Sequence, residues 1–377
     1  MKNTATLRRW AVPAAIGATV IGVGVGATLV QAGDGDSLPP KTAAQLLTDV
    51  QNAQIDGLSG TVVTQASLGL PAGIAGGGGA DMSSLLSGSK TMRVWYGGPD
   101  RIRGAILGTL GESDFIRNGA DVWTWSSEEN TATHTTLAED FADTAMWPPK
   151  AIAGEPITPD EAAESVLAAI SGTTEVTTDG TAEVAGRPAY ELVLKPKDPA
   201  STIGEIRLAV DGETSLPLRT QVFGVGQSDV AFEVAFARVI FETPPDEHFT
   251  FTPPQGVEVT EMGEQDFGKH DAEDKAGEGE PGEGMEIIGE GWTAVAEFTS
   301  DDLGTFLSGE PVEGAEGMDP EAGQGVNALL ESLPQVSGAW GSGRVFTSAL
   351  VNALITDDGR ILVGAVTTDK LVEVAGR

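Results

Sequence analysis

Short segments in which apolar and polar residues alternate, divided by turn sequences, fill the stretch between Gly60 and Leu137. Alternation with period two is typical of strands, because successive strand side chains point to opposite faces of a sheet. The turn sequences include Gly-Gly-Pro-Asp before Arg101 and the hairpin pair Asn118-Gly119. The predicted strands are residues 60–70, 91–96, 101–110, 113–117, 121–126 and 131–137. Regular spacing of this kind predicts an antiparallel sheet or barrel.

Two helical patterns interrupt the strands. Thr42 and Gln45 form a capping box, and an apolar periodicity follows it to about Gln54. Thr158 precedes Pro159, a favoured first helical residue, and Gly172 ends that second pattern. Strands then resume at residues 175–178, 181–185, 189–195, 204–210, 218–224 and 229–242. The expected fold class is mainly β (α+β), an antiparallel sheet accompanied by two short helices.

The stretch 263–286 is rich in Asp, Glu and Gly and almost free of apolar residues. Such a segment buries too little apolar surface to offset its ordering entropy, so we expect a disordered linker. After it, strands are predicted at 292–298, 344–355 and 360–366, with helices at 300–307, 326–333 and from Thr368. We therefore expect a domain over 42–262 and a small α+β domain over 287–377.

Residues 1–32 read as a signal anchor or a signal peptide. Lys2, Arg8 and Arg9 precede an uncharged run, and Ala11 to Val30 would span about 30 Å as a helix, which matches a bilayer core. The flanking charges place the N-terminus inside the cell and the bulk of the chain outside. Val30-Gln31-Ala32 also fits a signal-peptidase site. Two outcomes stay open: a single-pass protein of the cell membrane with an extracytoplasmic domain, or a protein secreted after cleavage behind Ala32.

Composition excludes most catalytic chemistry. The chain has no cysteine, and its three histidines, His134, His248 and His270, stand in no metal-binding or catalytic spacing. No G-x-S-x-G or Walker sequence is present. The formal net charge of -34 repels nucleic acid. We expect no catalysis, no cofactor, no metal and no nucleic-acid partner.

Apolar surface is the remaining feature. A sheet of half-apolar strands that curves around two helices leaves a hollow, and an acyl chain gains about 0.8 kcal/mol for each CH₂ buried there. The alternative is that the helices fill the hollow as an ordinary core. The residues predicted to line it are Val62, Met92, Val94, Ile102, Ile106 and Val122.

Four motifs carry a family resemblance. Residues 248–257 read H-F-T-F-T-P-P-Q-G-V, a predicted strand with Phe249 and Phe251 on one face that the prolines end near a sheet edge. This run is similar to the end of the LolA-type lipoprotein carriers. The stretches G-P-D-R-I-R at 98–103, R-N-G-A-D-V-W-T-W at 117–125 and V-D-G-E-T-S-L-P-L-R at 210–219 also resemble that family. The last resembles RseB as well.

The resemblance implies a half-open, curved antiparallel barrel with a helical lid that binds acyl chains. Residues 287–377 exceed a plain carrier and resemble RseB-type sensors, which bind the external part of an anti-sigma factor. The expected function is an extracytoplasmic binder of the acyl chain of a lipid or lipoprotein, held at the membrane by its N-terminal segment or secreted. The alternative is a regulatory sensor whose partner is an anti-sigma factor or another envelope protein.

Overall fold

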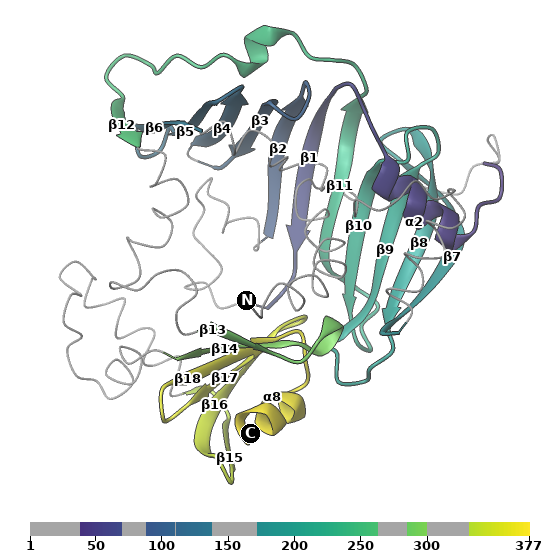
Figure 1. Ribbon diagram of the computed structural model, residues 1–377, viewed down its shortest axis with the longest axis vertical. Helices are drawn as coiled ribbons and strands as arrows, with labels where there is room; N and C mark the ends of the chain where they lie inside the picture. The colour runs from purple at the N-terminus through teal and green to yellow at the C-terminus, as the bar shows by residue number, and fades with distance from the viewer. Residues whose placement is uncertain (1–37, 70–87, 110, 138–171, 263–284, 300–331) are drawn as a thin grey trace, which may run out of the picture. The chain divides into compact units, whose positions relative to one another are not determined.

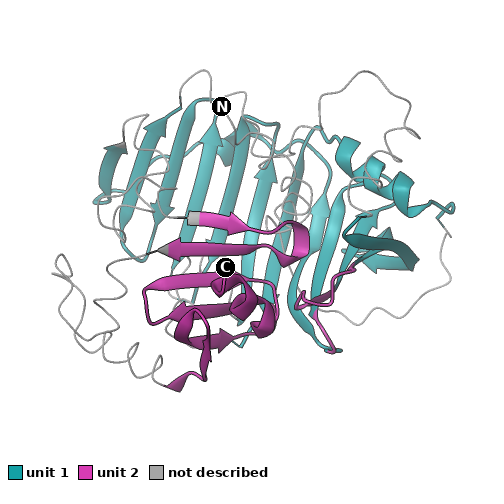
Figure 2. Cartoon of the chain, turned by 60° about the horizontal axis from the view of Figure 1, so that its bottom comes forward, with its two compact units in different colours: residues 1–195, 205–223, 227–267 teal, residues 196–204, 224–226, 268–377 magenta. Residues whose placement is uncertain are grey.

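The computed structural model describes residues 38–69, 88–109, 111–137, 172–262, 285–299 and 332–377. The chain divides into two compact units, coloured separately in Figure 2. The first comprises residues 1–195, 205–223 and 227–267, and the second comprises residues 196–204, 224–226 and 268–377. Each unit is built on a β-sheet of its own.

A 12-stranded sheet dominates the first unit, and with the smaller sheet of the second it confirms the mainly β fold. Its strand order is β12-β6-β5-β4-β3-β2-β1-β11-β10-β9-β8-β7. Figure 1 shows one open, curved layer, and β7 contacts β11 although three strands lie between them. The strands are β1 (Leu58–Ala66), β2 (Gly88–Tyr96), β3 (Arg101–Leu107), β4 (Glu112–Asn118), β5 (Asp121–Ser126), β6 (Thr131–Thr136), β7 (Thr174–Val184), β8 (Arg187–Pro196), β9 (Ile203–Asp211), β10 (Pro217–Gly224), β11 (Val230–Ile240) and β12 (Glu258–Met262).

The turns predicted at 118–119 and between 126 and 131 are confirmed, whereas the two strands predicted at 175–178 and 181–185 are one strand, β7. Gly119 and Asn130 adopt left-handed backbone conformations, with φ of 65° and 55°, at the turns that follow β4 and β5. Glycine and asparagine tolerate this region better than other residues, which explains why these turn sequences give hairpins. Consecutive strands from β1 to β6 therefore pair antiparallel.

Residues 241–257, which we call the strap, connect the centre of the sheet with its far edge. β11 pairs with β1 in the middle of the sheet, whereas β12 pairs in parallel with β6 at the edge. Figure 1 shows the strap running from the end of β11 to β12. Residues Asp246–Phe249 within it form one turn of 3₁₀ helix, η2.

The strand predicted within the run 248–257, before its prolines, is therefore wrong. Prolines stand on both sides of the aromatic residues, at 244–245 and 253–254, and proline has no N–H to donate to a ladder. The alternation of Phe249 and Phe251 reflects two contacts with the sheet rather than membership in it. The edge strand comes later, at Glu258.

Helix α2 spans Ala43–Asn52, and its predicted capping box is confirmed. The Thr42 hydroxyl accepts a hydrogen bond from the N–H of Gln45, and the Gln45 side chain accepts one from the N–H of Thr42. Its residues Leu46 and Leu47 are buried. The second predicted helix, the apolar run at 11–32 and most of the acidic stretch 263–286 lie outside the described residues. Within the described ranges, every helix is too short or too polar to cross a membrane.

The second unit holds a six-stranded sheet with helix α8 (Thr368–Ala375), a small α+β fold. Leu371 and Val374 of α8 pack with Val295, Leu354 and Leu362 of the sheet. Its strand order is β13-β14-β18-β17-β16-β15, and the short 3₁₀ helix η3 is Gly291–Thr293. The strands are β13 (Met285–Ile288), β14 (Val295–Thr299), β15 (Gln335–Gly338), β16 (Gly341–Thr347), β17 (Asn352–Thr356) and β18 (Arg360–Gly364).

The single strand predicted over 344–355 is two strands. Ser348 and Val351 close a turn between β16 and β17, because the N–H of Ser348 donates to the carbonyl of Val351 and the N–H of Val351 donates to Oγ of Ser348. A serine hydroxyl can replace a backbone partner in this way without glycine or proline. Residues 348–351 therefore carry none of the glycine or proline signals that usually mark a turn.

Candidate functional site

Apolar residues predicted to line a lipid site lie together on one face of the large sheet. Val62 pairs with Met92, and Met92 pairs with Ile106. Residues directly opposite each other in neighbouring strands share a face, and Val94 returns to that face two residues after Met92. We call the surface that carries these four residues the Val62 face.

The last two predicted residues belong to the same surface. Ile102 lies on the Val62 face because its cross-strand partner Tyr96 follows Val94 by two residues. Ile102 also pairs with Arg117, and Arg117 pairs with Val122. The register therefore brings all six predicted residues to the Val62 face, a juxtaposition that the sequence alone did not fix.

Close packing covers the part of the Val62 face around β1. Val62, Met92 and Ile106 belong to a buried cluster that also contains Leu58, Tyr96 and Phe236, and Val94 and Ile102 pack against it as half-buried residues. Val122 is 2% exposed but stands apart from that cluster. Burial raises the pKa of the Tyr96 hydroxyl, and the nearby charge of Asp100 adds to the effect. Lipid binding by these residues stays a prediction.

Toward the β12 edge the Val62 face becomes polar. Residues that are cross-strand partners form rows across the sheet, and the row that starts at Ile106 continues through Ser113, Ser126 and Thr131. A second row runs through Thr124, Thr133 and Thr260. Sequence reasoning missed these rows because each strand alternates in an ordinary way, and only the cross-strand register aligns the hydroxyl groups. The face offers apolar contacts over β1–β3 and hydroxyl groups over β4–β6.

A buried arginine stands where the two parts of the Val62 face meet. Arg117 lies between Ile102 and Val122 and is 2% exposed. Its Nε donates to the carbonyl of Gly119 at 3.1 Å, which fixes the guanidinium against the turn after β4. A buried cation is stable only when its hydrogen-bonding groups find partners. Sequence reasoning used Arg117 as part of a family motif and assigned it no place in a site.

The opposite face of β2–β6 holds the strap. Arg103 forms a bidentate pair with Asp114, at 3.1 and 2.9 Å, and its third nitrogen lies 3.4 Å from the carbonyl oxygen of His248. Trp95 stacks on the ring of His248 with centroids 5.3 Å apart, and Arg101 pairs with Asp246 at 2.6 Å. We call the surface that carries Trp95 and Arg103 the strap face.

Aromatic contacts continue toward the edge of the strap face. The ring of Phe251 lies 5.3 Å from that of Trp123 and 6.0 Å from that of Trp125. His134 stacks on Trp123 at 4.3 Å, and its two ring nitrogens contact Asp121 and Glu261 at 3.1 and 2.8 Å. Glu261 belongs to β12, so these contacts fasten the end of the strap as well as its middle.

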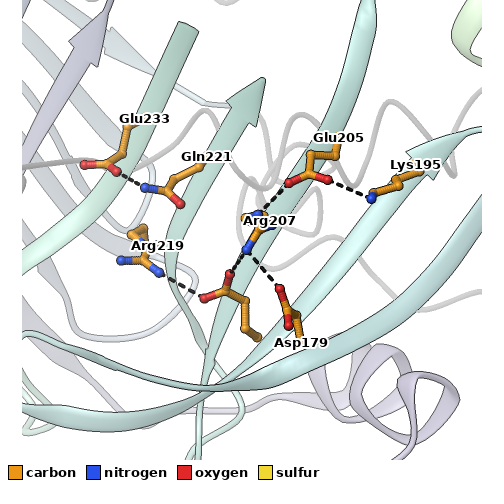
Figure 3. A network of polar contacts seen from close by, with 8 residues as sticks. Asp179, Lys195, Glu205, Arg207, Arg219, Gln221 and Glu233 are labelled. Atoms are coloured by element: carbon orange, nitrogen blue, oxygen red, sulfur yellow. Dashed lines mark hydrogen bonds and ion pairs between the residues drawn. The ribbon is translucent and has the colours of Figure 1, made fainter. Parts of the chain in front are cut away.

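Strands β7–β11 carry a network of ion pairs on the same face of the sheet (Figure 3). Arg207 contacts Glu205 at 2.6 Å, Glu191 at 2.9 Å and Asp179 at 3.1 Å. Arg219 reaches Glu191 at 3.2 Å, and Arg219 pairs across strands with Ala235, which pairs with Val63. Because Val63 points away from the Val62 face, the network lies on the strap face.

The ion pairs favour the ionised form of Glu205. Burial alone would raise the pKa of Glu205, but hydrogen bonds from Arg207 and Lys195 bring it below its ordinary value. The hydrogen bond to Glu205 in turn raises the pKa of Arg207. Arg207 and Arg219 thus each face a carboxylate across the strands, and these ion pairs tie β7–β10 together.

The segment that leads into α2 lies on the Val62 face. In β8, Tyr190 is the neighbour of Glu191, whose side chain belongs to the ion-pair network on the strap face. Because successive strand residues alternate, Tyr190 lies on the Val62 face. Its hydroxyl donates to the carbonyl of Pro39 at 2.7 Å, and Nζ of Lys41 lies 5.2 Å from the centre of its ring. The N-terminal helix is therefore attached on the apolar side of the sheet at β8.

The side chain of Asp211 holds the turn between β9 and β10 through several hydrogen bonds. The Asp211 side chain is fully buried and accepts from Arg187 at 2.6 and 2.9 Å, from the N–H groups of Glu213 and Thr214, and from the Thr214 hydroxyl. Burial alone would raise the pKa of Asp211, but Arg187 and Thr214 lower it below its ordinary value. The motif at 210–219 is thereby explained as a turn that its own side chains close.

No group of three His, Asp or Glu residues in the described part of the chain is arranged to hold a metal ion. His248 belongs to the strap and stacks on Trp95, and His134 stacks on Trp123 near the end of the strap. His270 lies outside the described residues.

Comparison with known proteins finds similar folds among solved structures only. No protein-family model matches the chain, and no curated protein matches it significantly. The MucA/MucB complex of Pseudomonas aeruginosa is 16% identical, with 88% of this chain and 96% of that chain covered and a TM-score of 0.45. A structure of MucB alone is 16% identical, with 88% and 94% covered and a TM-score of 0.40.

A LolA superfamily protein, NE2245 from Nitrosomonas europaea, is also similar. It is 13% identical, with 56% of this chain and 99% of that chain covered and a TM-score of 0.22. MucB is RseB-like, so these structures belong to the two groups that the sequence motifs resemble.

Proposed function

We propose that this protein is a non-enzymatic, extracytoplasmic binder of the acyl chain of a lipid or lipoprotein, and that the Val62 face is its binding surface. The protein would reach its ligand at the membrane surface, held there by its N-terminal segment or secreted after cleavage behind Ala32. No catalytic step is assigned, since the ionisable clusters described above are paired within the fold.

The observation that carries the proposal is the register of β1–β5. It collects Val62, Met92, Val94, Ile102 and Ile106 on one continuous apolar surface, with hydroxyl groups beyond them. A long apolar surface followed by hydroxyl groups matches an amphiphile, because each CH₂ removed from water stabilises the complex by about 0.8 kcal/mol. The hydrogen bond from Tyr190 to Pro39 attaches the segment before α2 to the Val62 face. This attachment supports a role for α2 in covering the bound ligand.

Fluorescent fatty-acid titration tests the proposal. The wild-type chain should give saturable binding. Val94→Asn should weaken it about tenfold, since an amide without a partner on an apolar surface costs about 1–2 kcal/mol. Val63→Asn is the matched control: Val63 is also half-buried and lies on the adjacent strand, but on the strap face. Absence of saturable binding for several chain lengths would overturn the proposal.

The second candidate function is a regulatory sensor that binds an envelope protein. Its support is the sheet face of the second unit opposite α8. Ala296 pairs with Ile287 and with Val363, so these three residues lie on the face away from Val295, and Ile287 and Phe298 are 43% and 37% exposed. Exposed apolar patches often mark protein contacts. Retention of an anti-sigma factor's external segment by the wild type, and loss of retention in Phe298→Asp, would support the sensor over the lipid binder.

A further inference from the structure

We propose that the hydroxyl of Thr64 donates a hydrogen bond to the carbonyl of an ester or amide at the head of a bound acyl chain. The ligand class is thereby narrowed to O- or N-acylated molecules, as opposed to plain hydrocarbons or ether lipids. This inference rests on the proposed function and names a specificity-determining residue for it.

The position of Thr64 places its side chain on the Val62 face. Thr64 follows Val62 by two residues in β1, and it pairs across strands with Val234 on one side and Lys90 on the other. Val62 and Val234 are 0% and 2% exposed, and Ala66, two residues further along, is 8% exposed. The Thr64 hydroxyl therefore lies between Val234 and Lys90, on a surface that Val62 and Ala66 make apolar along the strand.

The hydroxyl of Thr64 is buried without a partner in the part of the chain that the structure describes. Thr64 is 3% exposed, and its Oγ1 has no hydrogen-bond partner among the described residues. A buried hydroxyl without a partner is destabilising, and valine has nearly the same shape without that penalty. Threonine at this position is accounted for if a ligand supplies the missing acceptor.

The surroundings of Thr64 give the ligand a direction. Lys90 is half-buried and follows the exposed residues Gly88 and Ser89, so its end of the row is the one nearer to water. Met92 and Ile106 continue the apolar surface away from it. The ligand would place its polar head near Lys90, its carbonyl at Thr64 and its acyl chain over Met92. Each part of the ligand would then meet a side chain of matching polarity. An ether oxygen is a much weaker acceptor than a carbonyl, so Thr64 separates the two classes.

Competitive native mass spectrometry tests the proposal on the full-length chain. Detergent micelles would contain equal amounts of a diester glycerophosphocholine and a diether analogue with the same chain length. The wild type should carry the ester form in about tenfold excess, which corresponds to a single hydrogen bond. Thr64→Val should carry both forms equally, whereas Thr64→Ser, which keeps the hydroxyl, should retain the preference.

Thr91→Val is the matched control, because Thr91 lies on the adjacent strand with its side chain on the strap face. It should bind as the wild type does. Capture of both lipids without preference by the wild type, or an unchanged preference in Thr64→Val, would overturn the role of Thr64 and leave lipid binding intact. Capture of neither lipid would overturn both. The urea midpoint of Thr64→Val without ligand should rise, and a fall would show that the hydroxyl has a partner inside the fold.

Discussion

The two faces of the large sheet differ in how their residues find partners. On the strap face, Arg103, Asp114, Trp123 and Phe251 each have an aromatic or charged partner, and Arg207 has three charged partners. Trp125 and Arg219 each keep one buried N–H without a partner in the described structure. On the Val62 face, apolar side chains give way to rows of hydroxyl groups, and the hydroxyl of Thr64 is left without a partner in the described structure. The strap face carries the aromatic and charged contacts that hold the strap to the sheet, and the Val62 face is where we place the ligand.

This contrast gives the family motifs a physical meaning. The motif at 98–103 supplies Arg101 and Arg103, the motif at 117–125 supplies Trp123 and Trp125, and the motif at 248–257 supplies the aromatic residues that they hold. Three segments far apart in sequence thus meet at the strap. Residues that identify a fold in this way need not touch its ligand.

Phe249→Ala should give the largest loss of stability, because it removes the buried centre of the strap. Phe249 is 1% exposed, and its ring lies 5.7 Å from the guanidinium carbon of Arg101. Truncating a buried phenylalanine costs about 3–5 kcal/mol. Urea unfolding of the first unit measures the loss, and Phe298→Ala, at a partly exposed position in the second unit, is the control. A loss below about 1 kcal/mol would mean that the strap does not stabilise the sheet.

Asp211→Asn should rank next, with a loss of about 3 kcal/mol. The change leaves Arg187 facing a neutral amide and weakens the hydrogen bonds that the Asp211 side chain accepts in the turn between β9 and β10. Glu213→Gln is a sharp control, because Glu213 also contacts Arg187 at 2.9 Å but its side chain is 82% exposed. Exposed pairs contribute about 0–1 kcal/mol, so the two variants should differ clearly in their urea midpoints. Equal losses of stability in the two variants would contradict the conclusion that Asp211 holds this turn.

Acid should destabilise the first unit by protonating the Asp211 and Glu205 carboxylates. Because both carboxyl groups have a lowered pKa in the folded chain, the unfolded chain binds more protons as the pH falls. Their stabilisation is complete above the ordinary carboxyl pKa of about 4 and is lost as the pH falls through the lowered values. Urea midpoints from about pH 7 to about pH 3 should fall, and Asp211→Asn should fall less steeply. Parallel profiles would show that Asp211 is not among the groups responsible.

Sequence reasoning found the mainly β class, the capping box at Thr42 and the hairpin at Gly119 because local signals decide them. It failed at Phe249 and Phe251, where alternation arises from contacts with a distant sheet. It also failed at Ser348, whose side chain closes a turn that lacks glycine and proline. The hydroxyl rows and the orphan hydroxyl of Thr64 depend on cross-strand register, which one strand's sequence does not contain.

The most direct test compares the two faces with one probe. The chain has no cysteine, so a single introduced thiol is unique. Val94→Cys and Val63→Cys place it at half-buried positions on adjacent strands, on the Val62 face and on the strap face respectively. Saturating fatty acid should slow maleimide labelling of Val94→Cys several-fold and leave the rate of Val63→Cys unchanged. Equal effects on both rates, or none on either, would contradict an acyl site on the Val62 face.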